Sequence, residues 1–326
     1  MSIPFNRTGK IRILPEKDGE WMEFRDIDFK FDISRPIGGV YLKANISILG
    51  LSWDTICALA TWTSDGWSLV KNIRIQVFAG YGESGYNTCI FDGNIINATS
   101  TMPPQIWLNI LAYSGQWRSY YVLDGNPIPE SQLKFTEYMT RLANFIGASV
   151  DFSRCKNIDD NYIATKVFPQ GSTYQTVAEY MYNLALSKGM MMYEDVDGDG
   201  KSNFYLVNQY LDYSADQLES AKREHTISAA NGMIGIPKIT FSEAEVTKFL
   251  DTSLERTYFF YLDTVYAPDD RFSKQNGIVN GFYQINNIRH RGHLRGQEWY
   301  TTVKGYRYGD DGNGKLKRFS VEKKEA

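Results

Sequence analysis

Hydrophobic and polar residues alternate along much of the first 76 positions. Ile27, Phe29 and Phe31 are separated by charged residues, and from position 41 to 49 every second residue is apolar, beginning with Leu42. A period of two places successive side chains on opposite faces of a β-strand. These stretches therefore predict strands with one apolar face turned to a core and one face turned to solvent.

The pattern after residue 72 predicts a hairpin and a further strand. Residues 73–78 and 89–95 are apolar runs separated by the glycine-rich sequence from Gly80 to Gly85, and a third run covers 105–112. Glycine-rich sequence between two such runs is typical of a turn. Several short strands joined by turns favour a β-barrel or a β-sandwich.

Three stretches have apolar residues at helical spacing: 53–62, 130–146 and 173–186. Ser52 is a candidate N-cap for the first helix. Gly147 and Gly189 follow the other two helices, where a glycine commonly ends the last turn. Each of these two helices leads into an apolar strand, at 148–152 and 190–193, so the middle of the chain predicts two small helix-plus-strand modules.

Strand patterns return after Thr226, at 233–237, 239–241, 245–250, 257–262, 281–290 and 299–306. Together these patterns predict a mainly β protein with α+β inserts: two β-barrel domains plus two small helix-plus-strand modules. We place the four parts at 1–120, 121–165, 166–215 and 216–326. The basic tail 315–326 is expected to fray.

The amino-acid composition argues against several classes of protein. A chain of 326 residues with 43% hydrophobic and 22% charged residues is neither disordered nor fibrous. A net charge of −3 is too balanced for a dedicated nucleic-acid binder. The polar N-terminus lacks the apolar core of a signal peptide, and no apolar run is long enough to span a bilayer. We expect a soluble protein made in a cytoplasm.

The cysteines and aromatic residues add two expectations. Cys57, Cys89 and Cys155 are odd in number and form no paired framework, which fits a reducing compartment. The chain has 7 Trp, 22 Tyr and 18 Phe residues. Aromatic side chains in this number favour wide contact surfaces.

The segment Asp195–Asn203 comes nearest to a metal-binding motif. Asp195, Asp197 and Asp199 followed by Gly200 match the first half of a calcium loop. Position 12 would be Leu206, however, where a calcium loop needs a bidentate glutamate. A polar hairpin turn explains the segment without a cation, and the sequence leaves open whether Asp195–Asp199 binds one.

Two other segments resemble binding motifs. His290 and His293 lie in a basic stretch between two strand patterns, and with no Cys or carboxylate beside them we interpret the segment as a charged hairpin tip. The spacing of Gly80, Gly82 and Gly85 imitates a phosphate-binding loop. This loop joins two strands and no helix N-terminus follows it, so we interpret it as a turn.

No catalytic constellation emerges from the sequence. The chain has no G-x-S-x-G motif, and three histidines leave few choices for a triad. Acidic residues such as Glu20, Asp92 and Glu130 cannot be paired by their spacing. We therefore predict no catalytic, cofactor-binding or metal-binding residues, no cofactor and no enzymatic activity.

Four blocks of sequence, in order, resemble the baseplate hub proteins of contractile-tailed bacteriophages, the late control protein D-like family that includes the hubs of Mu-like phages. They are the hairpin 73–95, the helix and strand 174–193, the strand pair 232–254 with its I-G-x-P motif, and the closing hairpin 281–303. The blocks extend over roughly residues 70 to 305.

The resemblance implies a structural virion protein of the tail baseplate, assembled in the host cytoplasm. Such hubs are homotrimers in which two tail-tube-like barrel domains per chain form a pseudo-sixfold ring. The ring joins a hexameric tail tube or tube-initiator protein to a trimeric central spike, contacts other baseplate proteins and lets DNA pass without sequence-specific binding.

Two other classes of function stay open at this point. A carbohydrate-binding or cell-surface-binding tail module would need a cluster of exposed aromatic residues, which Trp62, Trp67, Trp107 and Trp117 could supply. A tail-associated glycan hydrolase would need a pair of catalytic carboxylates, and the sequence singles out none.

Overall fold

The computed structural model describes the greater part of the chain. The described residues are 6–15, 19–25, 27–38, 41–60, 73–114, 132–155, 158, 160–164, 177–196, 202–208, 215–240, 242–264, 280–310 and 316–318.

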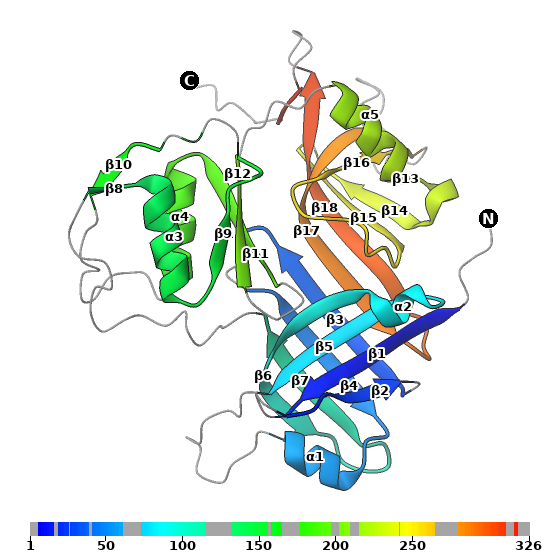
Figure 1. The fold of residues 1–326 in the computed structure, drawn as a ribbon. Helices are drawn as coiled ribbons and strands as arrows, with labels where there is room; N and C mark the ends of the chain where they lie inside the picture. The colour runs from blue at the N-terminus through cyan, green and yellow to red at the C-terminus, as the bar shows by residue number, and fades with distance from the viewer. Residues whose placement is uncertain are drawn as a thin grey trace, which may run out of the picture.

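Most strands belong to one 14-stranded sheet that extends through the molecule (Figure 1). Neighbouring strands follow the order β14-β15-β18-β17-β3-β4-β7-β6-β5-β1-β2, with β13, β16 and β19 attached beside this path. The strands of the first half are β1 (Arg7–Leu14), β2 (Met22–Arg25), β3 (Phe29–Pro36), β4 (Lys43–Leu49), β5 (Arg74–Tyr81), β6 (Cys89–Ser100) and β7 (Trp107–Tyr113).

The second half of the sheet comes from the C-terminal third of the chain. Its strands are β13 (Thr226–Ile227), β14 (Met233–Ile239), β15 (Glu243–Phe249), β16 (Phe259–Leu262), β17 (Gly281–His293), β18 (Trp299–Asp310) and β19 (Leu316–Arg318). The helix α5 (Ala215–Glu224) lies beside β16, and the 3-10 turn η2 (Ala229–Asn231) precedes β14. Leu218 of α5 packs with Phe259 and Tyr308.

The two halves meet where β17 pairs with β3. This antiparallel pairing extends from Asn287 opposite Pro36 to His293 opposite Lys30, although the two strands are more than 240 residues apart in the sequence. On its other edge β17 pairs with β18 along most of its length. The long strand β17 therefore belongs to both halves, and the backbone ladder is continuous across the seam.

The core of the first half includes residues from the second. Trp299 is 1% exposed and Leu250 is 5% exposed, and both pack in the cluster that β1, β3, β4, β5, β6 and β7 form around Ile46 and Ile75. Arg7 of β1 donates a hydrogen bond of 2.5 Å to the carbonyl oxygen of Gly296, in the turn between β17 and β18. The β17–β18 hairpin thus completes a core that the N-terminal strands begin.

The first half of the sheet folds back on itself around this core. A β-carbon on Gly9 of β1 would lie only 2.8 Å from the ring of Phe29 on β3, so the two strands face each other at close range. The helix α1 (Trp53–Leu59) contributes Ile56 and Leu59 to the same core. Glycine at position 9 is what lets the aromatic ring fill this space.

A separate core holds the middle of the chain together. The helices α3 (Phe135–Phe145) and α4 (Val177–Ser187) pack beside a three-stranded sheet of β9 (Ser149–Asp151), β11 (Met190–Val196) and β12 (Ser202–Asn208), while β8 (Gln132–Lys134) pairs with β10 (Tyr162–Ala164). β12 pairs in parallel with β9, so segments on both sides of residue 166 share one sheet and one core. We refer to this part as the middle unit. The proposed division at 121–165 and 166–215 stays a prediction.

Most of the elements expected from the sequence are present, and the prediction of a mainly β chain with small α inserts is confirmed. Ser52 caps α1 by accepting a hydrogen bond from the Thr55 amide. Gly147 and Gly189, with φ angles of 72° and 69°, follow α3 and α4.

Four details differ from expectation. The helix predicted from residue 130 begins at Phe135, because residues 132–134 pair with β10. The strand patterns at 233–237 and 239–241 give the single strand β14 (Met233–Ile239). The four-residue helix α2 (Ser84–Asn87) begins inside the predicted glycine turn and continues past it, where no helix was expected. The helix α5 was not predicted, since its apolar side is narrow and largely occupied by Leu218 and Ala221.

We predict that Trp299→Ala lowers the free energy of unfolding of the first half by about 3–5 kcal/mol, the usual cost of emptying a large buried aromatic site. The matched control is Trp53→Ala, because Trp53 is 61% exposed and should cost under about 0.5 kcal/mol. Urea unfolding and amide exchange in β1 and β3 provide the measurement. Equal effects of the two substitutions would show that the hairpin does not complete the core.

Candidate assembly surface and its junction

One face of the large sheet carries many polar and charged side chains in both halves of the molecule. In antiparallel pairs, directly opposed residues point to the same side of the sheet. A single row runs from Leu111 through Asn45, Asp32 and Arg291 to Tyr300, one residue on each of five neighbouring strands. The row crosses the seam between β3 and β17 without interruption, so the halves present one surface.

We call this surface the polar sheet face and define it by the outward residues of eight strands. They are Asn97 and Thr99 on β6, Asn109 and Leu111 on β7, Lys43, Asn45 and Ser47 on β4, Lys30, Asp32 and Ser34 on β3, Asn287, Arg289 and Arg291 on β17, Tyr300, Thr302 and Lys304 on β18, Glu243, Glu245 and Thr247 on β15, and Ile234 and Lys238 on β14. The apolar and aromatic residues Leu49, Trp107, Tyr113, Phe249 and Tyr306 lie on the same side of the sheet.

Exposure alternates along β17 from Asn287 to His293 and along β3 from Phe29 to Ser34, the stretches that pair across the seam. On β17, Ile288 and His290 are fully buried, whereas Arg289 between them is exposed. On β4, Ile46 is 1% exposed and Asn45 beside it is open to solvent. None of the residues that define the polar sheet face is buried. Within the described residues this face is at least partly open to solvent, and the middle unit borders it where Tyr182 and Leu186 line a cavity together with Asn287 and Lys304.

Asp32 forms an ion-pair cluster at the seam. Arg289 donates to Asp32 through Nε at 2.6 Å, and Arg291 donates through Nε at 3.1 Å. Partial burial acts to raise the pKa of Asp32, but the hydrogen bonds and positive charges of the two arginines outweigh it and hold the pKa below the ordinary value of 3.8. The carboxylate consequently links β3 to β17 through side chains as well as through the backbone ladder.

A groove of about 510 Å³ lies over the second half of this face. Two further ion pairs lie in or beside the groove. The Lys238 ammonium lies 3.0 Å from a carboxylate oxygen of Glu245, and the Lys304 ammonium lies 2.8 Å from a carboxylate oxygen of Glu243. Thr247 and Thr302 hydrogen-bond across β15 and β18 at 3.0 Å. Charged and hydroxyl-bearing side chains predominate among the residues that line the groove, and Ile234 and the ring of Tyr300 add apolar surface.

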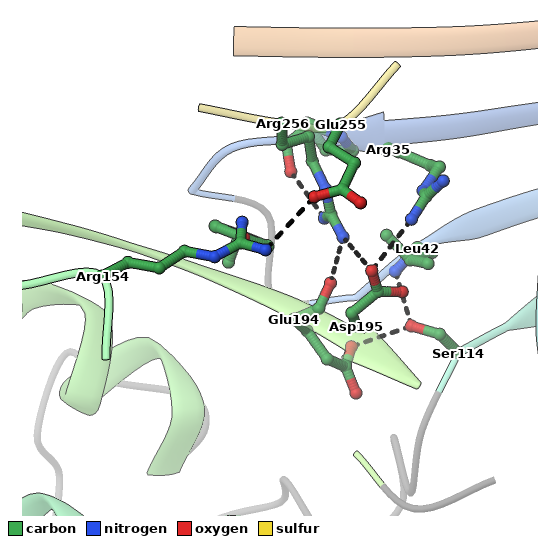
Figure 2. Close-up of polar contacts among 10 residues, drawn as sticks. Arg35, Leu42, Ser114, Arg154, Glu194, Asp195, Glu255 and Arg256 are labelled. Atoms are coloured by element: carbon green, nitrogen blue, oxygen red, sulfur yellow. Dashed lines mark hydrogen bonds and ion pairs between the residues drawn. The ribbon is translucent and has the colours of Figure 1, made fainter. Parts of the chain in front are cut away.

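A second set of side chains joins the middle unit to both halves of the sheet (Figure 2). We call Arg35, Ser114, Glu194, Asp195 and Arg256 the three-way junction. Arg35 and Ser114 come from the first half, Glu194 and Asp195 from β11, and Arg256 from the loop before β16. These residues are far apart in sequence and become neighbours only in the folded chain.

Arg256 is at the centre of the junction. Its side chain is 1% exposed, and it donates to the carbonyl oxygens of Glu194 at 2.6 Å and Pro36 at 3.4 Å. Its guanidinium also lies 3.5 Å from a carboxylate oxygen of Asp195. Burial and the like charge of Arg35 lower the pKa of Arg256 to about 10, so the group keeps its proton at neutral pH.

Glu194 and Ser114 form the other side of the junction. The buried Ser114 hydroxyl donates to Glu194 Oε2 at 2.8 Å and accepts from the Leu42 amide at 2.7 Å. Arg35 lies 3.0 Å from Asp195. The contacts of Arg35, Glu194 and Arg256 each link two different parts of the chain. Removing the buried Arg256 or Glu194 would leave a buried polar group without this partner.

Arg154 adds an outer layer to the junction. Its guanidinium hydrogen-bonds to the Tyr193 hydroxyl and lies 3.2 Å from Glu255, as Figure 2 shows for the carboxylate. It also lies 5.1 Å from the centre of the Tyr205 ring and 5.0 Å from that of Tyr258. The contact with Tyr205 lies within the middle unit, and the contact with Tyr258 joins the middle unit to the loop that carries Arg256.

The histidines singled out in the sequence do not lie together at a hairpin tip, so that prediction is wrong for His290. His290 lies inside β17, fully buried, and its Nδ1 is 2.9 Å from the Thr301 hydroxyl; burial lowers its pKa to about 3. His293 ends β17 and pairs with Asp28 at 3.2 Å. Their separation follows from the strand, because i and i+3 lie on opposite faces of a β-strand.

The structure describes all of the glycine-rich segment and part of the calcium-like segment. Gly80 and Gly85 pack against each other beside Thr8, consistent with a turn. In the calcium-like segment, Asp195 is held by Arg35, and residues 197–200 lie outside the described residues. Within the described ranges, no group of three or more His, Cys, Asp or Glu side chains could hold a metal ion.

The acidic and aromatic candidates form no catalytic or sugar-binding arrangement in the described ranges. Asp92 accepts from Arg74 at 2.7 Å and Gln76 at 2.5 Å, and Glu20 is exposed. Trp107 lies under the Lys30 ammonium at 4.3 Å. Glu130, Trp62, Trp67 and Trp117 lie outside the described residues.

The three cysteines are free thiols. Cys57, Cys89 and Cys155 form no disulfides. Burial raises the pKa of the Cys155 thiol to about 11, which makes it a poor nucleophile at neutral pH. Among the described helices, none is long and apolar enough to cross a membrane.

The fold is that of phage tail proteins. The chain is similar to a tail protein from Neisseria meningitidis MC58 (10% identity, 94% of this chain and 98% of that chain, TM-score 0.57). It is also similar to the 43 kDa tail protein of prophage MuSo2 from Shewanella oneidensis (9% identity, 92% and 98%, TM-score 0.56).

A third similar structure is the c3393 protein of E. coli, described as a component of the type VI secretion system with structural similarity to the T4 bacteriophage tail proteins gp27 and gp5 (8% identity, 90% and 76%, TM-score 0.52). No match was found among curated proteins.

A family model described as "Baseplate hub gp41" matches residues 25–305. The chain therefore belongs to this baseplate hub family, which confirms the resemblance to phage hub proteins found in the sequence. Membership makes it a baseplate protein of the phage tail.

We predict that Arg256→Met lowers the free energy of unfolding by about 3 kcal/mol, because the substitution leaves the buried groups around it without their cation. Arg141→Met is the control, since Arg141 forms an exposed pair with Glu137 on α3 and should change stability by less than about 0.5 kcal/mol. Urea unfolding and limited proteolysis of the middle unit test this. If Arg256→Met is as mild as Arg141→Met, the junction does not fix the middle unit.

We predict a pH-dependent effect of Asp32→Asn. The pKa of Asp32 in the folded chain lies below 3.8, so the ionised carboxylate stabilises the fold above that pH and loses its contribution as the pH falls through its folded pKa. The variant should be less stable than the unsubstituted protein by about 1 kcal/mol at neutral pH. Thermal melting between pH 7 and 2 should show this difference shrinking in acid, and a constant difference would contradict the assignment.

Proposed function

We propose that this protein is the central hub of a contractile tail, a homotrimer whose ring joins the tail tube to the central spike. In this proposal each chain supplies two tube-like β domains, so that three chains give six units around the axis. A cyclic trimer of double domains would present approximate sixfold symmetry to a hexameric tube and true threefold symmetry to a trimeric spike.

The observation that carries the proposal is the single sheet that passes through both halves. The pairing of β3 with β17 joins the two halves through one backbone ladder, so the halves of each chain would enter the ring in a fixed relative orientation. The polar sheet face has no fully buried defining residue in the described chain and extends across both halves. We propose that it faces the axis and lines the passage for DNA, which would meet hydroxyl, amide and paired charged groups without base-specific contacts.

The remaining partners follow from the same arrangement. The tube or tube-initiator protein would contact one rim of the ring, and the spike and other baseplate proteins would contact the other. The middle unit, held by the three-way junction, is in a fixed position to present one of these rims. Assembly in the host cytoplasm and release of DNA through the ring belong to this proposal, as does the absence of catalytic activity.

Light scattering tests the ring directly. The expected mass is three times that of the 37.3 kDa chain for the protein alone. If the ring forms only with the spike protein encoded in the same tail, the expected mass of the mixture is that of three hub chains plus the bound spike. The Arg141→Met variant should assemble like the unsubstituted protein, because its exposed pair lies on α3. A strict monomer both alone and with the spike would contradict the proposal and favour a monomeric binding module.

A further inference from the structure

The charges of the polar sheet face are arranged in pairs. The face carries six basic side chains, and four of them, Lys238, Arg289, Arg291 and Lys304, are held by three carboxylates of the same face. Asp32 holds both arginines, with contacts from each. Within the described residues, each carboxylate of the defined face therefore forms an ion pair with a neighbouring basic side chain.

Stability alone gives little reason for this arrangement. The Lys238 side chain is 82% exposed and that of Arg289 is 44% exposed. Exposed ion pairs contribute only about 0–1 kcal/mol each, since water screens them and the side chains lose rotational freedom. Cross-strand pairs of threonine, as between Thr247 and Thr302, could hold the same positions without charge.

Charge pairing has a larger effect on a polyanion near the surface. Cations that contact DNA phosphates bind it by releasing counterions, and each such contact adds to both affinity and salt dependence. A carboxylate 2.6 Å from Arg289 and 3.1 Å from Arg291 reduces the positive potential that both arginines offer to a phosphate. Glu243 and Glu245 do the same for Lys304 and Lys238.

We propose that Asp32, Glu243 and Glu245 mask the basic residues of the polar sheet face so that double-stranded DNA slides past it without being retained. This inference rests on the proposed function, which places DNA at this face. The three acids act as charge-masking residues: they do not touch DNA, and they set how strongly the neighbouring cations can hold it.

The test compares two triple variants of equal net charge. The first removes the masking acids: Asp32→Asn, Glu243→Gln and Glu245→Gln. The control removes three exposed acids that lie away from the face: Asp54→Asn, Glu83→Gln and Glu137→Gln. Binding of a fluorescent 30-base-pair duplex is measured by anisotropy at ~50 and ~150 mM salt, where phosphate contacts differ strongly in strength.

The masking variant should bind the duplex at least ~10-fold more tightly than the control at the lower salt, with a log–log salt slope steeper by about two. The unsubstituted protein and the control should bind with the same weak affinity. The single variant Asp32→Asn provides a second measurement if the triple variant folds poorly, and a gain of ~2-fold to 3-fold over Glu137→Gln is expected from unmasking two arginines.

Two results would overturn the inference: a masking variant that binds no more tightly than the control, or an unsubstituted protein that already binds as tightly as the masking variant. Light scattering on the same samples separates this outcome from the failure of the ring. A trimer without any gain in DNA binding removes the masking role alone. A monomer with the full gain shows that the three acids weaken DNA binding, but it removes the ring and with it the passage of DNA that the inference requires.

Discussion

The pairing of β3 with β17 is the constraint on which the rest of the structure depends. The ladder from Asn287 opposite Pro36 to His293 opposite Lys30 closes a loop of more than 240 residues, so the entropy of ordering the intervening chain must be recovered elsewhere. Burial of Trp299 and Leu250 in the core of the first half offsets part of this entropy cost. Neither half can be ordered independently of the other without leaving a large apolar site empty or an edge of the sheet unpaired.

The same constraint gives the protein its surfaces. Because β17 continues the sheet of the first half, the row of outward side chains from β6 to β14 becomes one face with one charge pattern. The middle unit is then oriented by the buried Arg256, whose contacts with Glu194 and Pro36 tie β11 to the end of β3. The proposed role as a connecting ring would need rigid geometry more than chemistry, and the buried polar junction and the shared strand both contribute to such rigidity.

Local patterns in the sequence predicted the elements but not their joining. The period of two along β4, Ser52 before α1 and the glycine after α3 each act over a few residues, and all three predictions are confirmed. The seam and the junction depend on residues that meet only in three dimensions. Asp32 is one charge in an alternating strand until Arg289 lies beside it, and Arg256 occupies a loop with no pattern of its own. Prediction of His290 as an exposed tip failed because the strand continues past it to His293.

Native-state hydrogen exchange would test the central claim, the unity of the two halves, most directly. If the shared strand makes them one cooperative unit, amides of β3, β17 and β18 should exchange with a single free energy, equal to that of global unfolding measured by urea. They should also respond in parallel as denaturant is added. If the amides of β17 and β18 instead exchange through an opening of much lower free energy while β1, β4 and β5 stay protected, the halves are independent domains and the account is wrong.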